Sequence, residues 1–246
     1  MKYRNLFLAL LSLLAMIPAC AQDTYQTDVF KTVHGKDVTI TAIKHGSLRI
    51  NFDGMEFEID PVANIPPVTD YKLMPKADYI LVTHEHKDHL DKEAIADLEK
   101  PGTVLVTNAN SAAIIGKGKV MRNGETLVLA PDVKLEAVPA YNITPGHLQF
   151  HPKGRDNGFV LTLDGLRIYI AGDTEDIPEM SDLKDIDVAF LPTNQPYTMT
   201  PEQTARAARM IKPKVLFPYH YGETKIERVS ELLKDSGIDV RIRNYQ

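Results

Sequence analysis

Two successive series of short strand-like runs, each accompanied by helix signals, most constrain how this chain folds. The first series covers residues 37–52, 55–61, 78–84, 102–107, 125–130 and 133–141, and Gly, Asn, Asp and Pro separate its β-branched or alternating runs. The second series comprises 158–173, which contains a hairpin turning on Asp164-Gly165, and the runs "IDVAFLP" and "PKVLFPYH". Two such series pack most simply as two sheets face to face with helices outside. The sequence therefore predicts an α/β fold, a four-layer αββα sandwich.

Helix signals lie between the runs in both series. The first series offers candidates at Asp91–Glu99 and Asn110–Gly116. In the second, "TPEQ" from Thr200 and "TKIE" from Thr224 both have the pattern of a capping box, which predicts that a helix begins at each. Pro213 forbids the first of these helices from continuing.

Residues 1–21 are interpreted as an export signal and not as part of this fold. Lys2 and Arg4 precede an apolar run from residue 6 to residue 17, which is too short to span a bilayer, and small residues follow. The stretch Ala19-Cys20-Ala21 fits a cleavage site, whereas Ile17-Pro18-Ala19-Cys20 resembles a bacterial lipobox in which Cys20 would carry a lipid anchor. Both interpretations predict an exported protein, either periplasmic or membrane-anchored as a lipoprotein, with one domain over residues 27–246.

Composition excludes several classes of function. Cys20 is the only cysteine, so the domain at 27–246 has neither a disulfide nor a thiolate metal ligand. The net charge of −5 offers no basic face for nucleic acid, and no nucleic-acid partner is expected. Nothing in the composition indicates an oligomeric state.

The stretch "THEHKDHLD", residues 83–91, brings together three of the chain's 8 histidines. It follows the apolar run "DYILV", so it occupies a loop at the carboxyl end of a strand, where sites of α/β proteins are commonly built. Alternation along the backbone points His84 and His86 the same way, while Asp88 and His89 face a second point beyond a turn. Imidazole and carboxylate groups suit Zn²⁺, and also Mn²⁺ or Fe²⁺. The stretch therefore predicts two neighbouring metal positions.

Two metal ions need further ligands from distant loops. Asp173, in "IYIAGDTE", ends a strand as His84 does, and we interpret it as a carboxylate that bridges the two ions. His220 closes the apolar run "PKVLFPYH" and is interpreted as a ligand rather than as a core histidine. His45 follows another apolar run near the predicted site, where it either contacts the ligands or substrate or lies at the surface. His34 has no identifiable partner and is expected in an exposed loop.

The stretches "THEHKDHLD", "AGDTE" and "PYHYG", in that order, resemble the metallo-β-lactamase superfamily of binuclear hydrolases. The resemblance covers nearly all of residues 27–246 and implies the αββα sandwich already predicted from the runs. It matches His84 and His86 to ligands of the first metal, Asp88 and His89 to ligands of the second, Asp173 to the bridging ligand, His220 to the last ligand, and Asp60 to an aspartate that orients a ligand imidazole.

The superfamily has one further histidine ligand upstream of its bridging aspartate, and this chain has two candidates. His147 lies in "TPGH", which resembles the glyoxalase-type branch. His151 belongs to a longer similarity with exported hydrolases, "PAYN…FHPKG…AGDT…PEM", and immediately precedes a strand-like run. We favour His151 and retain His147 as the alternative.

The resemblance implies a hydrolase in which two divalent ions, Zn²⁺ first and Mn²⁺ or Fe²⁺ as alternatives, share a hydroxide that attacks the substrate. Asp88 would bind metal and also act in catalysis by orienting that hydroxide. The expected function is an exported metal-dependent hydrolase of an ester, lactone, amide or phosphodiester in a small molecule or lipid. The alternative is a non-catalytic, metal-binding exported protein of the same fold. Tyr141 and Tyr197 are candidates for substrate contact or for packing.

Overall fold

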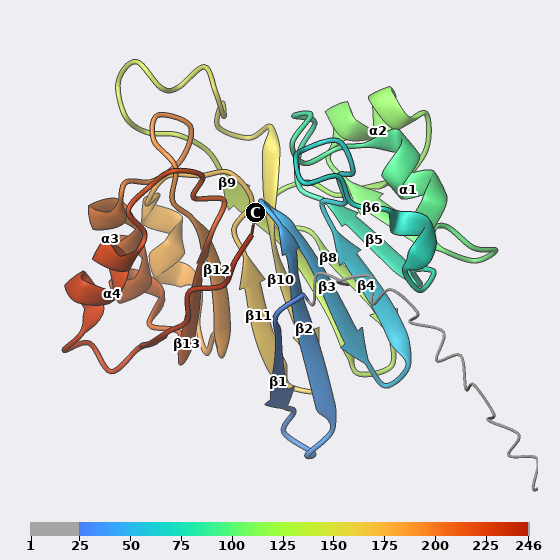
Figure 1. Ribbon diagram of the computed structural model, residues 1–246, viewed down its shortest axis with the longest axis horizontal. Coiled ribbons are helices and arrows are strands. Elements are labelled where there is room, and N and C mark those ends of the chain that lie inside the picture. The colour runs from blue at the N-terminus through green and yellow to red at the C-terminus, as the bar shows by residue number, and fades with distance from the viewer. Residues whose placement is uncertain (1–24, 246) are drawn as a thin grey trace, which may run out of the picture.

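The structure, a computed structural model, describes residues 25–245, so the predicted export signal at 1–21 and Cys20 lie outside the described residues. Two seven-stranded sheets pack face to face, and helices cover the outer surface of each (Figure 1). The predicted four-layer αββα sandwich is therefore confirmed. Among residues 25–245, no helix has the length and apolar character needed to cross a membrane.

The two sheets have the same topology. In the first, β1 to β4 form an antiparallel meander and β4 to β7 run parallel; in the second, β8 to β11 are antiparallel and β11 to β14 parallel. The first sheet contains β1 (Thr27–Lys31), β2 (Asp37–Lys44), β3 (Ser47–Phe52), β4 (Met55–Ile59), β5 (Tyr79–Val82), β6 (Val104–Thr107) and β7 (Lys119–Val120). The second contains β8 (Thr126–Ala130), β9 (Val133–Ala140), β10 (Asp156–Leu163), β11 (Leu166–Ile170), β12 (Val188–Pro192), β13 (Val215–Tyr219) and β14 (Asp239–Val240).

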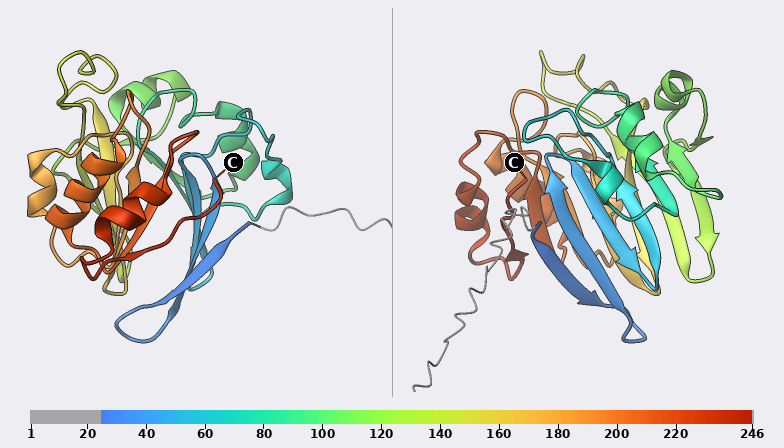
Figure 2. Two further views of the ribbon diagram at one scale, coloured as in Figure 1. Left: turned by 60° about the vertical axis from the view of Figure 1, so that its left-hand side comes forward. Right: turned by 45° about the vertical axis from the view of Figure 1, so that its right-hand side comes forward.

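Short helices complete the outer layers. The first sheet is covered by η1 (Tyr71–Leu73), α1 (Lys92–Leu98) and α2 (Ala109–Ile115), and the second by η2 (Pro178–Asp182), α3 (Pro201–Ile211) and α4 (Glu227–Leu233) (Figure 1). Views from two other sides show the same separation of the two helical layers by the paired sheets (Figure 2).

Three apolar clusters correspond to the three contacts between layers. The largest lies between the sheets and includes Phe190 and Phe217, whose rings stack with centroids 4.9 Å apart. A second cluster packs α3 and α4 on the second sheet, and a third packs α1 on β5 and β6. All five residues of β12 and of β13 are buried, as in strands covered on both faces.

Several local predictions are confirmed. Asp164 and Gly165 both have positive φ, 45° and 86°, and join β10 to β11 in a two-residue hairpin turn. Thr200 caps α3 in a capping box with Gln203. The strands β1, β7 and β14 were not predicted.

The second predicted capping box, at Thr224, is wrong. The helix α4 begins at Glu227, and its first residues lack a side-chain cap. The N–H of Thr224 donates instead to the carbonyl of Tyr221, in a turn that follows His220. The chain thus leaves the strand end through a tight turn before any helix forms.

Candidate metal centre

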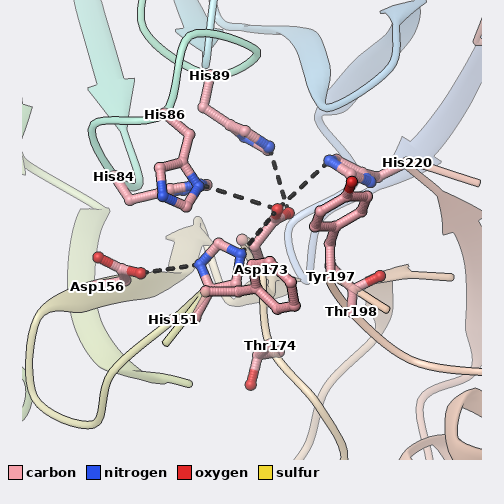
Figure 3. Close-up of polar contacts among 12 residues, drawn as sticks. His84, His86, His89, His151, Asp156, Asp173, Thr174, Tyr197, Thr198 and His220 are labelled. Carbon is pink, nitrogen blue, oxygen red and sulfur yellow. Dashed lines mark hydrogen bonds and ion pairs between the residues drawn. The ribbon is translucent and has the colours of Figure 1, made fainter. Parts of the chain in front are cut away.

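The predicted ligands come from both sheets and meet at one edge of the sandwich. β5 leads into His84 through one residue, β11 leads into Asp173 through two residues, and β13 leads directly into His220, whereas His151 lies in the connection between β9 and β10. We call this edge, at the carboxyl ends of β5, β11 and β13, the site edge. Figure 3 shows the imidazoles of four histidines pointing at the carboxylate of Asp173.

The first group of donors contains His84, His86, His151 and Asp173, with one ligand atom from each lying within 4.8 Å of the others. Nε2 of His151 is 3.4 Å from Oδ2 of Asp173, and Nε2 of His84 is 3.9 Å from the same oxygen. Apart from His86, these side chains are buried. The group has the residues predicted for the first metal position.

The second group contains His45, Asp88, His89 and His220. Nε2 of His220 lies 3.4 Å from Oδ2 of Asp88 and 3.4 Å from Oδ2 of Asp173. Nε2 of His89 lies 3.3 Å from Oδ1 of Asp173. Asp173 thus faces both groups, which is the placement that a bridging carboxylate requires.

Buried ligand atoms in this cluster lack hydrogen-bond partners. They are Nε2 of His89, both ring nitrogens of His220 and Oδ1 of Asp173. Buried polar atoms are ordinarily paired, and three of these atoms, Nε2 of His89, Nε2 of His220 and Oδ1 of Asp173, lie where the two donor groups meet, so they call for an additional partner. Imidazole nitrogens and carboxylate oxygens are donors that divalent transition metals accept, so the donor set fits the predicted ions.

A buried carboxylate below the cluster orients two of its histidines. Oδ1 of Asp60 accepts the N–H of Thr83 at 2.7 Å, and Oδ2 accepts the Thr83 hydroxyl at 2.6 Å. Oδ2 also lies 2.8 Å from Nδ1 of His89, while the Thr83 hydroxyl lies 2.9 Å from Nδ1 of His84. A proton on Nδ1 of His89 leaves Nε2 free to bind metal, which agrees with the orienting role expected of Asp60.

Asp156 plays the same part for the other group and was missed in the sequence. Its Oδ2 lies 3.0 Å from Nδ1 of His151. The guanidinium of Arg155 binds both oxygens of Asp156 and the carbonyl of Phe150. An acidic residue shortly after a proposed histidine ligand, at the start of a strand, was the available signal.

The electrostatics separate neutral ligands from charged ones. Burial lowers the pKa of His84 well below its ordinary value and also lowers that of His86, so both imidazoles are neutral. Burial opposes ionisation of Asp173, but the imidazoles of His220 and His89 outweigh it and hold the pKa of Asp173 well below the usual range. Burial likewise opposes a charge on His89, yet the carboxylates of Asp173 and Asp60 raise its pKa well above the ordinary value. The cluster therefore combines an ionised Asp173 with both neutral and positively charged imidazoles.

The remaining histidines differ in their position relative to the two donor groups. His147 lies outside both donor groups; its Nδ1 is 3.4 Å from Oε1 of Glu175. Of the two alternatives, the structure thus brings only His151 to the cluster. His45 is at the site, since its Nε2 is 3.2 Å from Oδ2 of Asp88 and its ring centroid is 3.7 Å from that of His220. His34 is exposed, as expected, and the partner that the sequence did not reveal is Asp164 at the β10–β11 turn, whose Oδ1 lies 2.5 Å from its Nδ1.

The two tyrosines that are candidates for substrate contact, Tyr141 and Tyr197, have different surroundings. The Tyr141 hydroxyl donates to Glu179 and accepts from Lys153, so it is occupied in packing. Tyr197 is 48% exposed, lies beyond the end of β12 at the site edge, and packs against Phe150 with ring centroids 5.0 Å apart. Tyr197 therefore stays a candidate for substrate contact.

Comparisons with known proteins agree with this geometry. A model of the beta-lactamase superfamily domain matches residues 39–220. A metal-dependent hydrolase from Ligilactobacillus salivarius is 37% identical over 194 residues, which are 74% of this chain and 84% of that protein. The crystal structure of a proposed metal-dependent hydrolase from Parabacteroides distasonis has 60% identity and a TM-score of 0.88, covering 91% of this chain and all of that one. A metallo hydrolase from Ignicoccus hospitalis, at 24% identity, shares the fold with a TM-score of 0.71 over 84% of this chain and 95% of its own.

Proposed function

This chain belongs to the metallo-β-lactamase superfamily, and we propose that, as a metal-dependent hydrolase of that superfamily, it holds two divalent ions between its sheets. The observation that carries the proposal is the position of Asp173, whose carboxylate lies 3.4 Å from His151 of the first donor group and 3.3–3.4 Å from His89 and His220 of the second. Zn²⁺ is the expected ion, and Mn²⁺ and Fe²⁺ are the alternatives that a nitrogen and oxygen ligand set accepts.

The proposed ligands divide evenly around Asp173. The first ion is assigned to His84, His86 and His151, the second to Asp88, His89 and His220, and Asp173 is shared. Divalent ions bound there supply an acidified water molecule and an electrophilic contact for the substrate's carbonyl or phosphoryl oxygen.

The chain's own residues fix and orient the reacting groups. The side chain of Asp88, at 39% exposed, is the most accessible carboxylate of the cluster, and its contacts with His220 and His45 hold it ionised with a pKa below the ordinary range, although burial opposes this. An ionised, accessible carboxylate can accept a hydrogen bond from the attacking water and orient it, so we assign that role to Asp88. Asp60 and Asp156 hold the histidine rings below it.

The substrate class is an ester, lactone, amide or phosphodiester of a small molecule or lipid. We also propose that the protein is exported, because Lys2, Arg4 and the apolar run at 6–17 have the order of a secretory signal. Cys20 would then either lie at the cleavage site or carry a lipid anchor.

Elemental analysis of the purified protein beside His151→Ala and His147→Ala tests the proposal. We expect about two ions per wild-type chain and a lower metal content in His151→Ala only. We also expect hydrolysis of a nitrophenyl ester, a lactone or bis(p-nitrophenyl) phosphate that stops when a chelator is added and returns with Zn²⁺ or Mn²⁺. Activity that persists after complete removal of metal would refute the mechanism. Two bound ions without hydrolysis of any substrate in the panel would favour the metal-binding protein instead.

A further inference from the structure

Exposed apolar side chains gather on loops around the site edge. The clearest are Val68, Ile143, Leu148 and Tyr197, which are 77%, 41%, 51% and 48% exposed. Val68 follows β4, the next two lie between β9 and β10, and Tyr197 follows β12, so all four lie beyond strand ends at this edge. The loop between β9 and β10 projects beyond the sheets in Figure 1 and in both views of Figure 2.

A buried positive charge holds the first of these loops, residues 63–68. Lys44, at the end of β2, is buried, and its ammonium donates to the carbonyl of Ala63 at 3.2 Å and to those of Ile65 and Pro67. These alternate carbonyls turn inward toward the ammonium, and the side chain of Val68, which follows them, is exposed. Burial of an ammonium is costly without such bonds, so the loop conformation and Lys44 depend on each other.

A buried negative charge holds the second loop, residues 143–150. The carboxylate of Glu175 accepts the N–H groups of Ile143 at 2.7 Å and of Thr144 at 2.6 Å, and it also meets His147. The amide of Asn142 donates to the carbonyl of His147 and, at 2.9 Å, to the carbonyl of Tyr197. The second loop is thus fixed to the segment that carries Tyr197.

Both loops lack charged side chains, are held by buried charged groups, and adjoin residues of the two donor groups in the sequence. Residues 63–68 and 143–150 contain no Asp, Glu, Lys or Arg, and His147 is their single titratable side chain. The second loop runs directly into His151, and Lys44 immediately precedes His45. A charged substrate would find no ionic partner on these loops, whereas an apolar group would bury exposed surface without an ordering cost.

We propose that these two loops and Tyr197 bind the apolar part of the substrate, an acyl or aryl group of several carbons whose scissile bond lies at Asp173. This inference rests on the proposed hydrolase function and narrows its substrate class. The scissile group would reach inward between Asp88 and His151, and the chain would extend outward past Phe150 and Tyr197, whose rings meet edge to face.

The experiment compares p-nitrophenyl acetate, butyrate and octanoate on the metal-loaded wild type, on Val68→Ser/Leu148→Ser and on Val128→Ser. Val128 is the matched control, since it is 70% exposed but lies on β8, outside the site-edge loops. We expect kcat/KM of the wild type and of Val128→Ser to rise about twofold per added methylene, as for a half-buried chain, and the double variant to lose most of this dependence. Equal chain-length dependence in the double variant and the wild type, or none in the wild type, would overturn the inference.

A second readout does not require hydrolysis. Calorimetry with octanoate and butyrate on the same three proteins measures the chain-length preference by binding, so it tests the inference even if every ester proves inert and the proposed function fails. Preferential binding of octanoate by the wild type and by Val128→Ser, but not by the double variant, would support it. Sedimentation of the protein with neutral phosphatidylcholine vesicles, without binding of monomeric octanoate, would overturn it in favour of a membrane-facing surface.

Discussion

Substitution of Gly46 by alanine tests the position of His89 without removing any ligand. A Cβ atom at residue 46 would lie 2.7 Å from Cε1 of His89 and 3.0 Å from Nδ1. The nearest neighbours of this Cβ are all atoms of the His89 ring. The backbone of Gly46 is not left-handed, unlike that of most glycines in this chain, so the substitution acts through this one contact.

The size of the effect follows from these distances. Ordinary contact begins at 3.4 Å, so the imidazole must retreat by about 0.7 Å, the difference from 2.7 Å. Metal–ligand distances tolerate only about 0.2 Å. The retreat also disturbs the 2.8 Å contact between His89 and Asp60. We expect Gly46→Ala to weaken binding of the second ion about 10- to 100-fold and to lower folding stability by about 1–3 kcal/mol.

The assay is competition of the metal-loaded protein with a chromophoric chelator, together with elemental analysis and chemical denaturation. Gly54→Ala is the control, because it perturbs the neighbouring β3–β4 turn, where φ is +78° and nothing lies within 4 Å of the added methyl group. That variant should lose stability but keep both ions. Undiminished affinity for two ions in Gly46→Ala would refute the steric argument, and with it the assignment of His89 as a ligand.

Three further predictions concern the surroundings of the same ring. Asp60→Asn replaces the buried acceptor of His89 and should weaken metal binding about 10- to 100-fold in chelator competition. The control is Asp164→Asn, because Asp164 also contacts a threonine and a histidine but lies at a remote turn, and this variant should bind metal as the wild type does. Equal losses of affinity in the two variants would contradict the prediction. His45 has a left-handed backbone, φ 45°, which asparagine also tolerates, so His45→Asn should change the free energy of unfolding little. The substitution removes a contact to Asp88, so the second ion should bind more weakly. Burial lowers the pKa of His89 less than its neighbouring carboxylates raise it, so without metal the ring is protonated on both nitrogens at neutral pH. A metal ion that binds Nε2 must displace the proton there. Metal affinity should therefore increase with pH, with release of about one proton seen by calorimetry in buffers of different ionisation enthalpy; heats independent of buffer would contradict it.

Features that depend on neighbouring residues could be predicted from the sequence. The Asp164-Gly165 turn requires two positive φ angles, which these residues tolerate, and the Thr200 capping box requires only residues three positions apart. His84 and His220 were recognisable because each follows, with at most one residue between, a mostly buried apolar strand. The position of a residue at the end of a strand can be predicted from the local sequence pattern. Candidate ligands can therefore be identified before any tertiary contact is known.

Features that depend on distant contacts could not be predicted. β7 and β14 have two residues each, too few for a pattern, and form because a neighbouring strand presents a free edge. Lys44 and Glu175 look like ordinary surface charges in the sequence, yet both are buried below apolar loops. His34 finds its carboxylate 130 residues away along the chain. Sequence patterns carry no information on such pairings, because the partners meet only once the sheets have packed.

The cluster itself shows why packing of the sheets and metal binding must be linked. Each donor group takes ligands from both halves: the first joins His84 and His86 to His151 and Asp173, and the second joins Asp88 and His89 to His220. Neither half alone can complete a metal position, so the apolar layer between the sheets sets the distances between ligands. By mass action, an ion that binds only the assembled cluster stabilises that packing in return. The buried carboxylates of Asp60 and Asp156, one from each half, then fix ring orientations that the sheets bring within range. The precision of the site therefore derives from the sheet interface, and the identity of its ligands from the strand ends.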